Sequence, residues 1–104
     1  MKDNAKFGAS EPGIGLAAGQ FLVEAEAVVV VGADTWGVEV MPNPDASLSA
    51  PVHQLLLARN GIYLHENLIT ADLARDNAYE FMYSFAPLRF KGATGSPGNP
   101  IAIR

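Results

Sequence analysis

The run of four valines from Val28 to Val31 constrains the fold of this chain more than any other feature. Valine side chains are restricted at χ1 and are unfavourable in helices, so the sequence predicts a strand over residues 27–31. Because the run is continuous and apolar, we expect that strand to be buried on both faces. A helix that leads straight into such a strand is typical of an α/β fold. Apolar residues at helical spacing predict that helix over residues 14–25: Ile14, Ala17, Ala18, Phe21, Leu22 and Ala25.

Further elements follow along the rest of the chain. Residues 51–60 are predicted to form a second helix, with Ser49 as its N-cap and Gly61 after its last turn. The buried side of this helix is expected to consist of Val52, Leu55 and Leu56. We also predict strands over residues 62–64, 79–87 and 101–103, a short helix over 70–77, and an extended lead-in over 1–11.

Composition excludes several classes of function. The chain has 104 residues and a formal net charge of −4, whereas nucleic-acid binding needs a basic surface, so we expect no nucleic-acid partner. The absence of cysteine excludes thiol catalysis and cysteine-based zinc sites. No apolar stretch is long enough to span a membrane and the N-terminus is polar, so we expect no membrane segment and a cytoplasmic location. Because 49% of the residues are hydrophobic, we expect a partner to cover part of the surface.

His53 and Glu66 form a candidate metal-binding pair. His53 lies in the first turn of the second predicted helix, and Glu66 follows the strand into which that helix leads. A short helix and a returning strand can bring these two positions together. Imidazole nitrogen and carboxylate oxygen are common ligands of zinc and manganese. Spacing alone leaves a second interpretation open, in which His53 is hydrogen-bonded locally and Glu66 is solvated.

Asp34, Trp36 and Glu39 are candidates for lining a substrate site. They follow the valine strand, and in open α/β sheets ligands bind at the carboxyl ends of the strands. The two carboxylates are equally suited to capping a backbone or to facing solvent. Ser84 and Ser96 lack the surroundings of a catalytic serine, and no glycine cluster forms a complete phosphate-binding loop.

Four sequence blocks occur in order along the chain: GADTWGVE at 32–39, PVHQLLL at 51–57, GIYLHENL at 61–68 and PLRFKGATGSP at 87–97. In this order they resemble the C-terminal part of the cyclase family of metal-dependent hydrolases, which includes bacterial kynurenine formamidases and isatin hydrolases. The resemblance extends from about residue 11 to residue 104.

The resemblance implies a swivelling β/β/α-type fold, with residues 12–104 forming the C-terminal portion of a single cyclase-like domain. It also implies that His53 and Glu66 are metal ligands and that the cofactor is a divalent metal, Zn²⁺ or Mn²⁺. The implied reaction is hydrolysis of the amide of an aryl formamide such as N-formylkynurenine, as in tryptophan catabolism. A cyclic amide such as isatin is the other implied substrate.

The main metal-binding segment of that family, a His-x-x-x-His-x-Asp motif, does not occur in this sequence, whose only histidines are His53 and His65. We therefore expect a C-terminal fragment with no catalytic residue of its own. Its partners would be a small-molecule amide and either further copies of itself or a chain that supplies the N-terminal half. The alternative is a catalytically inactive remnant or partner subunit that keeps the fold without metal.

Overall fold

The computed structural model describes residues 3–104, which form two compact units. The first unit ends at Thr70 and the second spans Ala71–Arg104, so the boundary lies inside the range 12–104 that was expected to belong to one domain. Each unit combines helix with one two-stranded sheet. The expected mixed α/β class is therefore confirmed at this coarse level.

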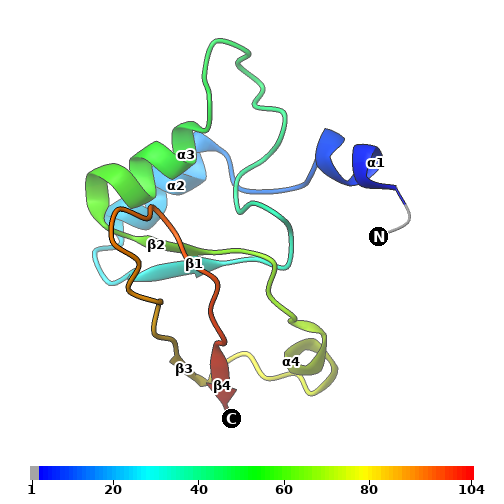
Figure 1. The fold of residues 1–104 in the computed structure, drawn as a ribbon, viewed down its shortest axis with the longest axis vertical. Helices are drawn as coiled ribbons and strands as arrows, with labels where there is room; N and C mark the ends of the chain where they lie inside the picture. The colour runs from blue at the N-terminus through cyan, green and yellow to red at the C-terminus, as the bar shows by residue number, and fades with distance from the viewer. Residues whose placement is uncertain (1–2) are drawn as a thin grey trace. The chain divides into compact units, whose positions relative to one another are not determined.

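The first unit is built on a parallel pair of strands. β1 (Val30–Gly32) pairs with β2 (Tyr63–His65), so that Gly32 lies opposite His65 at the carboxyl end of both strands. Parallel strands need a long crossover connection, which here includes helix α3 (Pro51–His53) and its continuation, the π-helical segment η1 (Gln54–Arg59). Helix α2 (Leu16–Glu24) lies alongside α3 and η1, and η1 packs against β2 (Figure 1).

The core of the first unit lies between these helices and the strands. Val52 and Leu56 are fully buried and Leu55 is half-buried, which confirms the predicted buried side of the second helix. Ile62 completes the buried cluster. Half-buried apolar residues pack around it: Ile14, Leu22, Val23, Val28, Val31 and Leu64. Because Val52 is anchored in this core, the next residue along the chain, His53, is held at its edge.

The valine run forms a shorter and more exposed strand than the sequence predicts. Only Val30 and Val31 belong to β1, and both are half-buried. Val29 is 68% exposed, so the expectation of a strand buried on both faces is wrong. The physical reason is that the core covers one side of this segment: Val28 and Val31 pack against the buried cluster, whereas Val29 does not.

The start of α3 differs from the prediction in its capping group. Ala50 occupies the N-cap position in a left-handed conformation, and no side chain of the cap residue bonds to the helix. The carbonyl oxygen of Ser49 accepts a hydrogen bond from the Gln54 side chain instead. At the other end of the helical region the prediction holds, since Gly61 follows the last turn with a φ of 66°.

The segment over residues 11–14 pairs through backbone hydrogen bonds with the segment over residues 38–41. Glu11 and Met41 exchange backbone hydrogen bonds of 2.9 and 3.2 Å, and the Ile14 amide donates to the Val38 carbonyl oxygen at 2.9 Å. The residues before this segment are helical, because Asp3 caps α1 (Asn4–Ala9) by accepting a hydrogen bond from the Lys6 amide. The predicted extended lead-in is therefore wrong for residues 4–9, while residues 1–2 lie outside the described range.

The second unit contains α4 (Ala71–Arg75) and an antiparallel pair, β3 (Met82–Ser84) with β4 (Ile101–Ile103). The last strand matches its prediction, and β3 is shorter than the predicted range 79–87. Asp76 forms ion pairs with both Arg75 and Arg104 inside this unit. Among the helices described in residues 3–104, none is long and apolar enough to cross a membrane.

Candidate functional site

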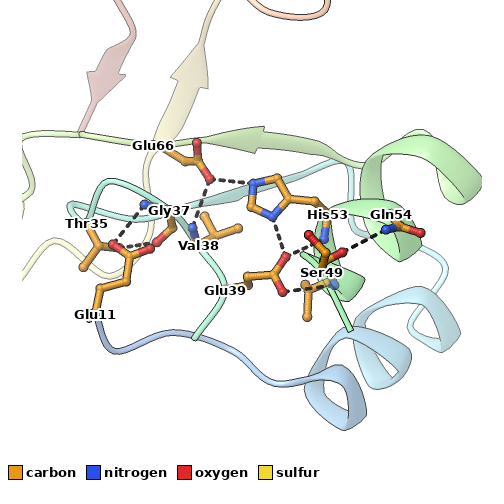
Figure 2. Close-up of polar contacts among 10 residues, drawn as sticks. Glu11, Thr35, Gly37, Val38, Glu39, Ser49, His53, Gln54 and Glu66 are labelled. Carbon is orange, nitrogen blue, oxygen red and sulfur yellow. Dashed lines mark hydrogen bonds and ion pairs between the residues drawn. The ribbon is translucent and has the colours of Figure 1, made fainter. Parts of the chain in front are cut away.

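The side chain of His53 lies between two carboxylates, as Figure 2 shows. Its Nδ1 atom is 2.5 Å from Oε2 of Glu39, and its Nε2 atom is 3.1 Å from Oε1 of Glu66. The imidazole is 35% exposed, whereas Glu39 is 1% exposed. The two positions predicted to come together, His53 and Glu66, are therefore adjacent, and Glu39 joins them on the buried side of the ring.

Glu39 is held at the start of α3 by the backbone of that helix. Its carboxylate accepts hydrogen bonds from the amides of Val52 (3.4 Å) and His53 (2.9 Å). The first amides of a helix have no partner within the helix, and a negative charge at that end is favourable. Glu39 thus supplies the cap that the sequence assigned to Ser49. It reaches this position because its own segment pairs with Ile14.

Glu66 lies at the carboxyl end of the parallel strand pair. It directly follows β2, and its Oε1 atom accepts a hydrogen bond from the Val38 amide at 3.1 Å. The loops after the two strands are tied together, since the Asn67 amide donates to the Thr35 carbonyl oxygen at 2.8 Å. The carboxyl ends of parallel strands are the usual place for a ligand site in α/β sheets.

Glu11 is a further buried carboxylate that the sequence did not single out. It is 7% exposed, and its Oε2 atom accepts a hydrogen bond from the Gly37 amide at 3.1 Å. Its Oε1 atom is buried and has no hydrogen-bond partner among residues 3–104. The only local signal is a glutamate directly before Pro12–Gly13, at the end of the predicted extended lead-in.

Gly37 allows Glu11 and Glu66 to approach the same point. A methyl group on Gly37 would lie 2.5 Å from Oε1 of Glu11 and 3.6 Å from Oε1 of Glu66. The first distance is too short for any real contact, so a larger residue at this position would force the Glu11 carboxylate to move. The sequence block around Trp36 and Gly37 is therefore explained by the close packing of carboxylates against its backbone.

The site carries an excess of negative charge. Two carboxylates, those of Glu39 and Glu66, contact the single imidazole, and a third, that of Glu11, is bonded to the Gly37 amide. Within the described chain, no lysine or arginine forms an ion pair with any of them. Carboxylates in a buried setting are costly unless they are hydrogen-bonded and balanced by positive charge. Glu39, the buried carboxylate at the ring, meets this cost through hydrogen bonds from the Val52 and His53 amides.

The other residues predicted to line a substrate site are placed differently. Asp34 is exposed and accepts a hydrogen bond from the Thr70 hydroxyl at 3.1 Å. Trp36 is half-buried, and its Nε1 atom is buried without a hydrogen-bond partner in the part of the chain that the structure describes. Glu39 lies beneath the His53 ring, with both carboxylate oxygens bonded. Of the three, only Glu39 contacts His53.

Metal coordination by this chain alone is incomplete. Within residues 3–104 no group of three or more histidine, cysteine, aspartate or glutamate side chains is arranged to hold a metal ion. His53 Nε2 and Glu66 Oε1 provide two donor atoms, whereas zinc in proteins takes four ligands in most sites.

No family model, curated protein or solved structure matches this chain. Interpretation of the site therefore depends on its geometry and on the residues themselves.

Proposed function

We propose that this chain contributes His53 and Glu66 to the metal centre of a metal-dependent hydrolase that cleaves amide bonds, in line with its resemblance to the cyclase family. The observation that supports the proposal is the distance of 3.1 Å between His53 Nε2 and Glu66 Oε1. An imidazole nitrogen beside a carboxylate oxygen is a donor set that suits Zn²⁺ or Mn²⁺. The buried Glu39 carboxylate and the half-buried Glu66 carboxylate on either side of the same ring also favour a cation there.

The remaining ligands would come from a polypeptide segment that carries the His-x-x-x-His-x-Asp motif. When bound, the divalent ion acts as a Lewis acid that polarises the amide carbonyl and makes water a stronger nucleophile near neutral pH. This chain's own contribution is to hold two ligands in place. Glu66 is fixed by the Val38 amide, and His53 is fixed by Glu39 and by the buried Val52 beside it.

The substrate class that we propose is an aryl formamide such as N-formylkynurenine, or a cyclic amide such as isatin. Trp36 supports this choice, because a half-buried indole in the loop that carries Glu39 offers a flat apolar surface to an aromatic substrate.

Calorimetric titration of the 104-residue chain with Zn²⁺ and with Mn²⁺ tests the metal assignment. We expect binding by the unmodified chain and a loss of affinity of at least tenfold in His53→Gln and in Glu66→Gln, since even groups that only support a ligand contribute about 10–100-fold. The matched control is His65→Gln, which removes the only other histidine and should bind normally. Equal binding by all four proteins would refute the assignment.

Hydrolysis is tested separately from binding. Formate release from N-formylkynurenine and ring opening of isatin would be followed with the metal-loaded chain, alone and mixed with a polypeptide that carries the missing motif. We expect turnover in the mixture and its loss when His53→Gln replaces the unmodified chain. Metal binding without turnover in any mixture would contradict the proposed reaction but not the metal site.

A second candidate is a non-catalytic subunit that associates through apolar surface. Large apolar side chains in the first unit support it, because Phe21 and Val29 are each 68% exposed and Ile69 is 88% exposed. Such residues at the surface of a small unit favour contact with another chain. Sedimentation of the chain with and without Zn²⁺ tests this candidate, which predicts association that does not depend on metal.

A further inference from the structure

Asn60 and Gly61 end the helical region formed by α3 and η1, and they are the only asparagine–glycine pair in the chain. The backbone nitrogen of the residue after an asparagine can attack the side-chain amide carbon. Glycine in that place has no side chain to hinder the approach. Both residues are exposed, so water reaches the product of such an attack. The pair therefore combines the chemistry and the solvent access that deamidation needs.

Deamidation of this pair takes two steps. The backbone nitrogen of Gly61 loses its proton to solvent and attacks Cγ of Asn60, so that a new N–C bond replaces the bond from Cγ to Nδ2 and ammonia leaves. The product is a cyclic imide. Water then adds to one of the imide carbonyl carbons and breaks its C–N bond, which leaves aspartate or isoaspartate. The chain gains one water and loses one ammonia, with no oxidation or reduction.

The fold opposes the first step at both reacting groups. The Gly61 amide donates to the Leu57 carbonyl oxygen at 3.2 Å. Nδ2 of Asn60 donates to the Leu55 carbonyl oxygen at 2.7 Å. Ring closure also requires the Gly61 nitrogen and Cβ of Asn60 to be eclipsed about the Cα–C bond, and a ψ of −3° at Asn60 holds these two atoms apart. The attack can therefore take place only when this last turn opens.

We propose that Asn60 is a deamidation site whose rate is set by opening of the last turn of η1, and that the acidic product no longer fits this turn. A carboxylate has no hydrogen to donate, so the Leu55 carbonyl oxygen loses its partner. A negative charge at the C-terminal end of a helix is also unfavourable. Ile62, directly after the pair, belongs to the buried cluster, and its amide donates to the Leu56 carbonyl oxygen at 2.9 Å. The change therefore reaches the core of the first unit, and it does not depend on a bound metal.

Peptide mapping by mass spectrometry tests the site on the unmodified chain. The chain would be held at mildly alkaline pH, with and without enough urea to unfold it, while the acid form of each asparagine is quantified over time. We expect Asn60 to convert at least about tenfold more slowly in the folded chain than in urea, because opening the turn breaks two hydrogen bonds. Asn67 and Asn77 precede leucine and alanine and should convert more slowly than Asn60 in urea. Conversion of Asn60 that is no faster than theirs in urea, or equal in the folded and unfolded chain, would overturn the proposal.

Leu56→Ala tests whether opening of the turn sets the rate. This substitution removes a fully buried side chain beside the turn, so it should speed conversion of Asn60 in the absence of urea by at least about tenfold and leave the rate in urea unchanged. The matched control is Leu57→Ala, which shortens the neighbouring side chain, 39% exposed, and should change the rate little. Equal rates in Leu56→Ala and in the unmodified chain would overturn the role of the turn.

Asn60→Asp reproduces one product of the reaction and tests how that product fits. We expect its urea midpoint, followed by the fluorescence of Trp36 in the first unit, to fall below that of the unmodified chain. The control is Asn77→Asp, which makes the same change of charge in the second unit and should shift the midpoint less. A midpoint for Asn60→Asp at or above that of Asn77→Asp would overturn the proposed effect of the product.

Discussion

Substitution of Gly37 by alanine tests how tightly the carboxylates pack at the candidate site. The added methyl group would lie 2.5 Å from Oε1 of Glu11 and 3.6 Å from Oε1 of Glu66. Only the first contact is prohibitive, so the Glu11 carboxylate must move. Glu11 is 7% exposed and its other oxygen is bonded to the Gly37 amide, so it has little room to move without losing that bond.

The size of the effect follows from the hydrogen bond that Glu11 would lose and from the steric cost of the added methyl group. A hydrogen bond to a charged group contributes about 1.5–3 kcal/mol, and forcing an extra methyl group into a packed site costs about 1–3 kcal/mol. Because movement of Glu11 relieves part of the second cost, we expect Gly37→Ala to lower the free energy of unfolding by about 2–4 kcal/mol. Gly95→Ala is the control, since a methyl group there meets no atom within 4 Å, and its effect should stay within about 0.5 kcal/mol.

The assay is urea unfolding followed by tryptophan fluorescence. Trp36 is the only tryptophan and is the neighbour of Gly37, so its emission reports on the first unit. The double variant Gly37→Ala with Glu11→Ala removes the clashing carboxylate, and its cost should be smaller than the sum of the two single costs. An unchanged midpoint in Gly37→Ala, or additive costs in the double variant, would refute the argument from packing.

Two further predictions concern the core and one surface loop. Leu56 is fully buried among Val52 and Ile62, so Leu56→Ala should lower the free energy of unfolding by about 2–5 kcal/mol, measured by the same urea assay. The pKa of Asp45 lies below its ordinary value because the Ser47 hydroxyl, and then the Ser47 amide, donate hydrogen bonds to its carboxylate. Ser47→Ala should therefore raise the pKa of Asp45, as followed by NMR titration of its carboxyl carbon. Because this pKa is lowered on folding, whatever stability the contact gives is present above the unfolded-state pKa and is lost as the pH falls.

The helical parts of the fold could be predicted from local pattern, while the extent of the strands could not. Apolar spacing predicted α2 to within two residues at its start, and the end of the second helical region at Gly61 follows from the need for a positive φ. A strand's length depends on its neighbours in the sheet. Residues 27–29 have strong strand propensity, yet they lie outside β1, which pairs with β2 over three positions.

The proximity of His53 and Glu66 was predictable because the connection between them is short and regular. His53 begins the helical region that ends before β2, and Glu66 directly follows that strand, so the pairing of β1 with β2 sets both positions. Their use as metal ligands is a different matter. It depends on donor atoms beyond this pair, about which the spacing of these two residues carries no information.

The burial of Glu11 and Glu39 could not be read from the sequence because local pattern assigns glutamate to the surface, although backbone capping was one of the roles left open for Glu39. Each is buried only because a backbone amide far along the chain donates to it: Gly37 for Glu11, and Val52 and His53 for Glu39. Those amides would otherwise be satisfied by water or by a small polar cap such as Ser49, at no cost in buried charge. A chain that buries two carboxylates where neutral groups would suffice must recover that cost elsewhere. A positive charge beside Glu39 would recover that cost, and the cation that we propose between His53 and Glu66 would supply such a charge.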